Sequence, residues 1–402
     1  MIAKPKENGI SSRADRDWTT IPFGEFATLQ RGKDLTKSQF RDGPFPVGGS
    51  NGIIGYHDTA IANGPGITVG RSGSAGKVTY FEQDFWPHNT ALYVKDFHGN
   101  DPLFTRYFFS HLDLSRFKTG ASVPTLDRNT FKMLPVAVPP LPEQKKIAHI
   151  LSTVQRAIEA QERIIQTTTE LKKALMHKLF TEGLRNEPQK QTDFGLVPEN
   201  WEVLPLSACA VVQTGIAKGR KVKREEAVEV PYLRVANVQD GYLDLSEMKM
   251  ITIRRAEQQR FALQAGDVVL TEGGDFDKLG RGFIWHGQVE GCVHQNHVFA
   301  VRPDFRRLSS EFFAYQAQSP YGKSYFLSVA HRTTNLACIN TTKLKAFPVI
   351  LPPKDQQKDI VAACHGIDEK IQVAHSKKRQ LEDLFRTLLH ALMSSKIRVG
   401  NN

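Results

Sequence analysis

The segment GRSGSAGKV at residues 70–78 is the first stretch whose residue types could do chemistry, because glycines and a lysine together can hold a phosphate group. It lacks the spacing of a Walker A loop: Arg71 stands where the first glycine is needed, and Val78 follows Lys77 in place of serine or threonine. The neighbouring GPGITVG at residues 64–70 lacks the glycine spacing of a dinucleotide-binding turn, and we expect a turn between two strands there. Neither segment predicts nucleotide binding.

Metal-binding and acid–base chemistry are equally weakly indicated. Cys292, His294 and His297 have the residue types of a zinc site, but no fourth ligand follows at the spacing of a zinc finger, so packing with a hydrogen bond is the favoured interpretation. Asp275 and Asp277 could be paired carboxylates, although a loop is the better interpretation of EGGDFDK. A Gly-x-Ser-x-Gly nucleophile motif and the Asn/Asp-Pro-Pro-Tyr motif of amino-methyltransferases are both missing from the sequence. We therefore predict a chain with no catalytic residues, no metal and no cofactor of its own.

Basic and polar side chains remain as candidates for a functional site. Lys plus Arg total 53 against 42 for Asp plus Glu, a formal charge of +11, which favours a polyanionic partner. Lys and Arg neutralise phosphates, and Arg and Asn can contact guanine and adenine edges. Ordinary solvated surface charge is the alternative for each of them. The predicted DNA-binding residues are Arg31, Lys33, Arg71, Ser72, Ser74, Lys77 and Lys118 in the first half of the chain, and Arg220, Lys221, Arg234, Arg281, Arg332, Thr333 and Asn335 in the second.

The elements that must position these side chains occur twice. KMLPVAVPPLPEQKKIAHIL at residues 132–151 aligns without gaps on KAFPVILPPKDQQKDIVAAC at residues 345–364, an offset of 213 residues. The same offset relates Leu171 to Leu384, and Trp18 matches Trp201 at a shorter offset. The chain is therefore predicted to be an internal duplication.

Each repeat is predicted to be a globular part followed by a long helix. In the first, the β-branched and aromatic runs Ile67–Val69, Val78–Phe81 and Ala91–Val94 lie between glycine-rich turns, as strands do, and Thr105–Leu114 has a helical pattern. Val136–Val138 is a strand-like run that Pro139 and Pro140 end.

No proline or glycine occurs from about residue 143 to 182, where apolar residues recur at helical three- and four-residue spacing. The second repeat has the same spacing of apolar residues. We expect the two helices to pack on each other antiparallel; the alternative is an ordinary surface helix on each domain. The predicted positions for helix pairing and partner docking are Leu151, Val154, Ile158, Ile165, Leu175 and Leu179 in the first helix, and Ile367, Ile371, Leu381, Phe385, Leu388 and Leu392 in the second.

The four cysteines are far apart and show no Cys-x-x-Cys spacing, so a disulfide framework is not expected. The sequence has neither a secretory signal nor a run of about 18 apolar residues that could span a membrane. We therefore expect a protein of the cytoplasm with no membrane partner.

The sequence resembles a type I restriction-modification specificity subunit. The resemblance rests on residues 119–151 and their echo at residues 332–364, together with PENW at residues 198–201, and it spans nearly the whole chain. Lys354, Asp355 and Gln356 depart from the more typical Leu-Pro-Glu of the first repeat, a difference that concerns the start of the second helix and not the fold.

The resemblance implies an α+β fold with two α/β target recognition domains separated by two long antiparallel helices that form a coiled coil. On that plan, target recognition domain 1 covers residues 1–141, the central helix 142–183, a linker 184–198, target recognition domain 2 residues 199–353 and the C-terminal helix 354–397.

The resemblance also implies that each recognition domain reads one half of a bipartite, asymmetric target in double-stranded DNA. Two adenine-methylating modification subunits would dock on the helices and bring S-adenosylmethionine, and motor-nuclease restriction subunits would join them. Two alternatives are a non-catalytic coiled-coil scaffold that assembles proteins without reading DNA, and a single-chain methyltransferase, which the missing catalytic motif disfavours.

Overall fold

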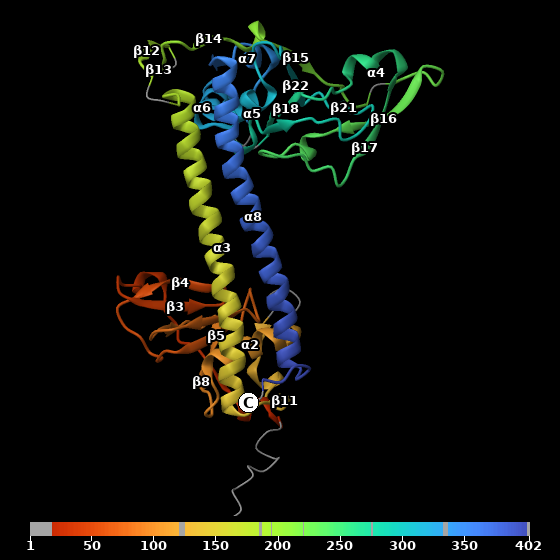
Figure 1. Cartoon of the computed structure of the whole chain (residues 1–402). Helices are drawn as coiled ribbons and strands as arrows, with labels where there is room; N and C mark the ends of the chain where they lie inside the picture. The colour runs from red at the N-terminus through yellow and green to blue at the C-terminus, as the bar shows by residue number, and fades with distance from the viewer. Residues whose placement is uncertain are drawn as a thin grey trace, which may run out of the picture. The chain divides into compact units, whose positions relative to one another are not determined.

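A computed structural model describes residues 18–119, 125–184, 187–193, 195–219, 221–274, 276–332 and 337–399. The chain divides into two compact units: unit 1 covers residues 1–162 and 376–402, and unit 2 covers residues 163–375. Two long helices, α3 (Leu141–Thr181) and α8 (Lys354–Met393), each begin in one unit and end in the other. Each unit therefore holds one mixed α/β lobe and a part of both helices (Figure 1).

Lobe 1, residues 18–138, is built on two small sheets. One has the strand order β2-β8-β5-β6, the other the order β4-β3-β7, and β1 pairs antiparallel with β11 where the lobe meets α3. The elements are β1 (Thr19–Pro22), α1 (Phe23–Phe26), β2 (Thr28–Arg31), β3 (Phe45–Gly49), β4 (Gly52–His57), β5 (Gly66–Gly70), β6 (Val78–Phe81), β7 (Trp86–Pro87), β8 (Ala91–Asp96), α2 (Pro102–Leu112), β9 (Lys118–Thr119), β10 (Thr125–Leu126) and β11 (Pro135–Val138).

Lobe 2, residues 201–351, repeats this topology. Its sheets have the orders β15-β22-β18-β20 and β17-β16-β21, and β14 pairs with β25 as β1 does with β11. The elements are β14 (Glu202–Pro205), β15 (Ala210–Thr214), β16 (Ala227–Leu233), β17 (Lys249–Arg254), α4 (Arg255–Phe261), β18 (Val268–Thr271), β19 (Gly273–Gly274), β20 (Gly282–Ile284), β21 (Val293–His294), β22 (Val298–Pro303), α5 (Ser310–Gln318), α6 (Pro320–Val329), β23 (His331–Arg332), β24 (Ala337–Cys338), α7 (Thr341–Lys345) and β25 (Pro348–Leu351). The predicted duplication and α+β fold class are thus confirmed.

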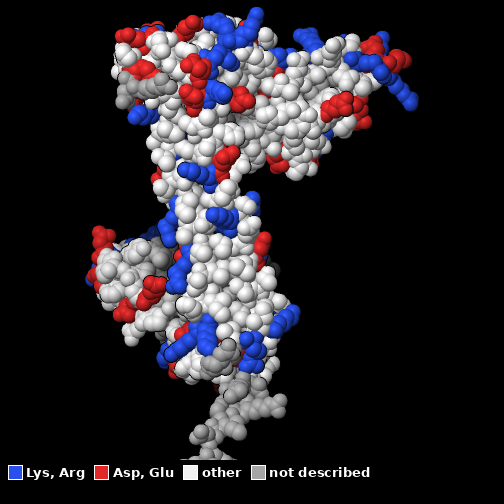
Figure 2. All heavy atoms as spheres, in the orientation of Figure 1, with Lys and Arg blue, Asp and Glu red and all other residues white. Residues whose placement is uncertain are grey.

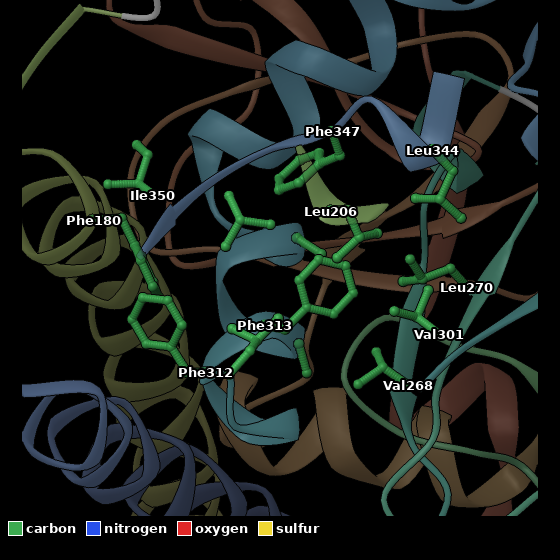
Figure 3. Close-up of a cluster of buried hydrophobic side chains, with 14 of the residues drawn as sticks. Phe180, Leu206, Val268, Leu270, Val301, Phe312, Phe313, Leu344, Phe347 and Ile350 are labelled. Carbon is green, nitrogen blue, oxygen red and sulfur yellow. The ribbon is translucent and has the colours of Figure 1, made fainter. Parts of the chain in front are cut away.

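Each lobe has its own apolar core. In unit 2, the strand residues Val268, Leu270 and Val301 pack with Phe313 and other aromatic side chains of the lobe (Figure 3). Phe180, at the end of α3, packs on Phe312 with the ring centroids 5.2 Å apart. Burial of such apolar surface is the main favourable contribution to folding, so each lobe and the helix ends next to it form one structural unit.

A buried glutamine fixes the start of each long helix to its lobe. Gln144 accepts a hydrogen bond from the backbone N–H of Asp101 at 2.9 Å and donates one to the carbonyl of Pro139, also at 2.9 Å. Gln357 makes the equivalent pair of bonds, with the N–H of Ser309 and the carbonyl of Pro352. The matched glutamines in the sequence repeat therefore have one structural role.

Replacing Gln144 with Leu is expected to lower the free energy of unfolding by about 2–4 kcal/mol, because a buried backbone donor and a buried acceptor lose their partners. The control is Gln380→Leu, at an exposed position on α8, which should change it by less than about 0.5 kcal/mol. Urea unfolding followed by circular dichroism measures both variants. Equal stability of the two variants would show that Gln144 does not hold the lobe on the helix.

Ion pairs join the two long helices in both units. In unit 1, Lys378 Nζ lies 2.6 Å from Glu162 Oε1, and in unit 2, Lys172 Nζ lies 2.6 Å from Asp368 Oδ1. Position numbers rise on α3 as they fall on α8, so the helices are antiparallel, as expected. Tyr315 of lobe 2 also donates to Asp368, at 2.8 Å, which ties α5 to the same carboxylate.

Several boundaries differ from the sequence-based expectation. The turn expected over GPGITVG at residues 64–70 does not cover the whole segment: Gly66–Gly70 is the fully buried strand β5, which confirms the strand expected at Ile67–Val69. Gly66 is needed there because an added Cβ would lie 2.2 Å from the ring of Phe85. The helical pattern at Thr105–Leu114 belongs to α2, which begins three residues earlier, at Pro102, and ends at Leu112.

The ends of the helices also differ. The expected linker at residues 184–198 contains a hairpin of β12 (Gln189–Thr192) and β13 (Gly195–Pro198). Helix α8 starts at Lys354 but ends at Met393 rather than at residue 397, because the chain turns at Ser395 (φ 52°) and Arg398 then donates to Glu143 Oε1 at 2.9 Å. Polar composition predicts neither a hairpin nor an ion pair between distant residues.

Every helix among the described residues is too short or too polar to cross a lipid bilayer.

Candidate nucleic-acid interface

Both lobes make the same close turn after the first strand of the larger sheet. A Cβ on Gly32 would lie 2.2 Å from the carbonyl oxygen of His88, and a Cβ on Gly215 would lie 2.0 Å from that of His294. Only glycine allows this approach. The turn places the residues on either side of each glycine next to one polar segment, residues 88–90 in lobe 1 and 295–297 in lobe 2.

Three of the predicted DNA-binding residues of lobe 1 surround residues 88–90. Arg31 Nε donates to the carbonyl of Asn89 at 3.4 Å, and Lys33 N donates to the carbonyl of Pro87 at 2.9 Å. Arg71 N donates to the carbonyl of Thr90 at 2.8 Å. The structure therefore brings together the backbone positions of basic residues that lie up to 40 residues apart in the sequence.

The other predicted residues of lobe 1 continue this surface. Ser72 forms a bridge with Thr125, which pairs in turn with the strand that begins at Lys118. Ser74 and Lys77 close the loop after β5, and Lys77 Nζ donates to the backbone and side-chain oxygens of Asn51, each at 2.9 Å. We call this the lobe-1 surface; its residues are Arg31, Lys33, Arg71, Ser72, Ser74, Lys77 and Lys118.

The predicted residues of lobe 2 are spread more widely. Arg332 lies on β23, Arg281 follows the loop after β18, and Arg234 precedes a short 3-10 helix and donates to the carbonyl of Glu247 at 2.8 Å. Lys221 is exposed in a loop. Arg220, Thr333 and Asn335 lie outside the described residues.

The equivalent of the lobe-1 surface in lobe 2 lacks several of its cations. Thr214 and Ile216 flank Gly215 where Arg31 and Lys33 flank Gly32. A groove with a volume of about 300 Å³ lies next to this position, and its polar lining residues include Glu272, His297 and His331. Counting cations in the sequence missed this groove; the signal that could have found it is the match between EGG at residue 272 and RSG at residue 71 in the aligned repeats.

Cys292, His294 and His297 do not converge on one point. Cys292 is buried, which raises the pKa of its thiol to about 12, and His294 Nδ1 lies 2.6 Å from the carbonyl oxygen of Val298. His297 is exposed, and its Nδ1 lies 2.5 Å from Glu272 Oε2. Protein groups thus engage both histidines, in line with the interpretation favoured from the sequence. No cluster of three or more His, Cys, Asp or Glu side chains with metal-binding geometry occurs in the described part of the chain.

The apolar positions predicted for the helices are buried or half-buried. They contact more than the other helix, however. Leu151 and Leu392 belong to the core of lobe 1, Leu179 belongs to the core of lobe 2, and Phe385 packs on Tyr107 with ring centroids 5.8 Å apart. An apolar repeat shows that a helix face is buried but not which element covers it.

The remaining predicted positions are half-buried along the two helices. They are Val154, Ile158, Ile165, Leu175, Ile367, Ile371, Leu381 and Leu388, of which Ile158 is the most buried. On the face shown in Figure 2, Lys and Arg side chains are interspersed with Asp and Glu on both units. The positive net charge is thus not gathered in a single patch on that face.

Comparison with known proteins assigns the family. A family model described as the type I restriction modification DNA specificity domain matches residues 15–169 and 198–383. The specificity subunit of the type I restriction enzyme MjaVIII from Methanocaldococcus jannaschii is 28% identical over 290 residues, which are 70% of this chain but only 66% of that protein. The specificity subunit of the type I restriction enzyme StySPI from Salmonella potsdam is 24% identical over 387 residues, which are 86% of this chain and 80% of the relative.

The fold is shared with a solved structure. The S subunit of a type I restriction-modification system from M. genitalium superposes with a TM-score of 0.59 at 16% identity, covering 95% of this chain and 98% of that chain. The family model matches most of the chain, in two segments that each contain one lobe and a large part of the helix after it. The chain therefore belongs to the family of type I restriction-modification DNA specificity proteins.

Proposed function

We propose that this chain is the specificity subunit of a type I restriction-modification enzyme, and that each lobe reads one half of a bipartite, asymmetric target in double-stranded DNA. The observation that supports this proposal most strongly is the duplication of one lobe topology with different side chains at equivalent surface positions. Matching sheet topologies would give both lobes the same way of approaching a duplex, while different side chains let them recognise different bases.

The lobe-1 surface supplies the chemistry that such recognition needs. Its cations can neutralise phosphates and so provide affinity, and its serines and arginines can form hydrogen bonds to base edges. A scaffold that only gathers proteins has no need for this surface.

Salt-dependent binding of the full chain to duplex DNA tests the proposal. We expect the logarithm of the binding constant to fall linearly with the logarithm of salt concentration. Arg71→Ala should reduce the slope by about one if Arg71 contacts a phosphate, or weaken binding to the preferred site if it contacts a base. Arg41→Ala is the matched control, because Arg41 belongs to the same lobe but pairs with Asp58. Absence of DNA binding at low salt would favour the scaffold alternative.

Two modification subunits, we infer, dock on the long helices. Leu171 on α3 and Leu384 on α8 are equivalent positions of the repeat, and both are exposed, at 58% and 45%. Exposed leucines on a helix surface are typical of a partner interface, and two equivalent positions suit two copies of one partner. Restriction subunits would join the complex through the modification subunits.

Replacing Leu171 with Glu is expected to remove one modification subunit from the complex, and replacing both Leu171 and Leu384 is expected to remove two. Each charge placed in an apolar interface should weaken that contact at least tenfold. Met133→Glu is the control, because Met133 is exposed on lobe 1 rather than on a helix. Native mass spectrometry of the reconstituted complex gives the stoichiometry. Two bound subunits in the double variant would place the docking surface elsewhere.

We propose that the chain is not itself catalytic and that its partners, the modification subunits, bind S-adenosylmethionine. Calorimetry of the isolated chain with S-adenosylmethionine should therefore show no binding, whereas the complex with modification subunits should bind it. Stoichiometric binding to the isolated chain would contradict this assignment. We place the protein in the cytoplasm, because its proposed target, double-stranded DNA, lies in the cytoplasm.

A further inference from the structure

Arg71 of lobe 1 and Glu272 of lobe 2 occupy the same backbone position. Arg71 N donates to the carbonyl of Thr90 at 2.8 Å, and its own carbonyl accepts from the N–H of Leu126 at 2.8 Å. Glu272 N donates to the carbonyl of His297 at 2.9 Å, and its carbonyl accepts from the N–H of Ile339 at 2.9 Å. Two backbone hydrogen bonds in lobe 1 therefore match two in lobe 2, and they align Arg71 with Glu272 without reference to side chains.

The loops that follow align in the same way. Gly70 N donates to the carbonyl of Lys77, and Thr271 N donates to the carbonyl of Arg281, both at 2.8 Å. A cation thus ends the loop in both lobes. The residue that begins the loop is a cation in lobe 1 and an anion in lobe 2, so the two lobes carry opposite charges at this position of a shared frame.

The two side chains offer opposite hydrogen-bonding chemistry. A guanidinium only donates, and it matches the paired acceptors O6 and N7 of guanine. Among the residues that the structure describes, none accepts a hydrogen bond from the Arg71 side chain. A carboxylate only accepts, and in the major groove it matches the N4 amino group of cytosine.

His297 holds the Glu272 carboxylate in place beside the groove. Its Nδ1 lies 2.5 Å from Glu272 Oε2, while the side chains of Glu272 and His297 are 27% and 57% exposed. A hydrogen bond between side chains this exposed contributes little to stability, and the backbone of Glu272 is already held by its own hydrogen bonds. The pair is therefore better explained by a role at the surface than by a role in folding.

A carboxylate at this position also disfavours contact with phosphates, because the two groups repel each other. Its placement in a protein of net charge +11 is consistent with contact to a base. We propose that Glu272 determines one base of the second half-site by accepting a hydrogen bond from a cytosine amino group, with His297 as its positioning residue. This inference rests on the proposed function, since it requires that lobe 2 reads DNA.

Selection of the full chain against a library of randomised duplexes, followed by sequencing, tests the inference. The wild-type chain should select a bipartite site. Glu272→Gln should lose about tenfold or more of its discrimination at one base position of one half-site, and the other half-site should stay unchanged. Glu272→Arg should change the preference at that position to guanine, which makes lobe 2 resemble lobe 1 there. His297→Ala should weaken discrimination at the same position and at no other.

Glu290→Gln is the matched control, because it removes one exposed carboxylate from the same lobe and should change no base preference. Thermal unfolding of every variant shows whether the lobe is still folded. If the wild-type chain selects a site and the folded Glu272→Gln and Glu272→Arg variants select the same site equally strongly, the inference is wrong while the proposed function stands. If the wild-type chain binds no duplex, the proposed function itself fails and this inference falls with it.

Discussion

Replacing lobe 1 with the corresponding lobe of a family member that reads another sequence is expected to change one half of the DNA target completely and to leave the other half unchanged. The reason is that lobe 1 has its own core: its apolar cluster contains residues of lobe 1 and of the adjoining helix ends. The exchange should cover residues 18–138, because β11 must keep its antiparallel pairing with β1. Sequencing of methylated adenines in DNA exposed to the assembled complex gives the result.

The reciprocal exchange of lobe 2, residues 201–351, is the control for this experiment, and it should change the other half-site only. A chimera in which both half-sites change together would show that the lobes do not read DNA independently. Loss of all methylation with a folded chimera would instead point to a fault in partner docking, which the stoichiometry of the complex reveals.

The sequence predicted the framework well because the framework is repeated. Two Pro-Pro segments in register with Gln144 and Gln357 exposed the duplication, and the structure shows why these residues match: each glutamine fixes a helix to its lobe. The absence of proline and glycine over about forty residues predicted the first long helix, and the repeated apolar spacing predicted the second, although Gly366 lies within it. Their pairing followed from the repeated apolar pattern.

The candidate site was much harder to predict, since it depends on which loops meet. Arg31 and Arg71 are distant in sequence and come together only because Gly32 lets the chain pass close to His88. In lobe 2 a search for cations selected Arg234, which donates to the backbone of Glu247, and passed over Glu272. Net charge identifies a class of partner, but it does not identify base-reading residues that are acidic or neutral.

Lengthening both long helices by four residues is expected to lengthen the spacer between the half-sites by about two base pairs, without changing the bases that are read. Four helical residues add about 6 Å, and one base pair adds about 3.4 Å along the duplex. The pairs Glu162–Lys378 and Lys172–Asp368 are ten residues apart on α3 and ten apart on α8. On this register Gln166 faces Ala374, so insertions directly after Gln166 and directly before Ala374 leave each pair of facing residues on the same side of the insertion.

The matched control is the insertion after Gln166 alone, which moves Lys172 out of register with Asp368 and should abolish a stable complex. In the paired variant some affinity should be lost as well, since a displaced lobe must also follow the turn of the DNA groove. Mapping of methylated adenines measures the spacer directly. A paired-insertion protein that assembles and methylates at sites with the original spacer would mean that something other than α3 and α8 sets the distance, because an unbroken antiparallel helix pair cannot gain a turn without moving what is attached to its ends.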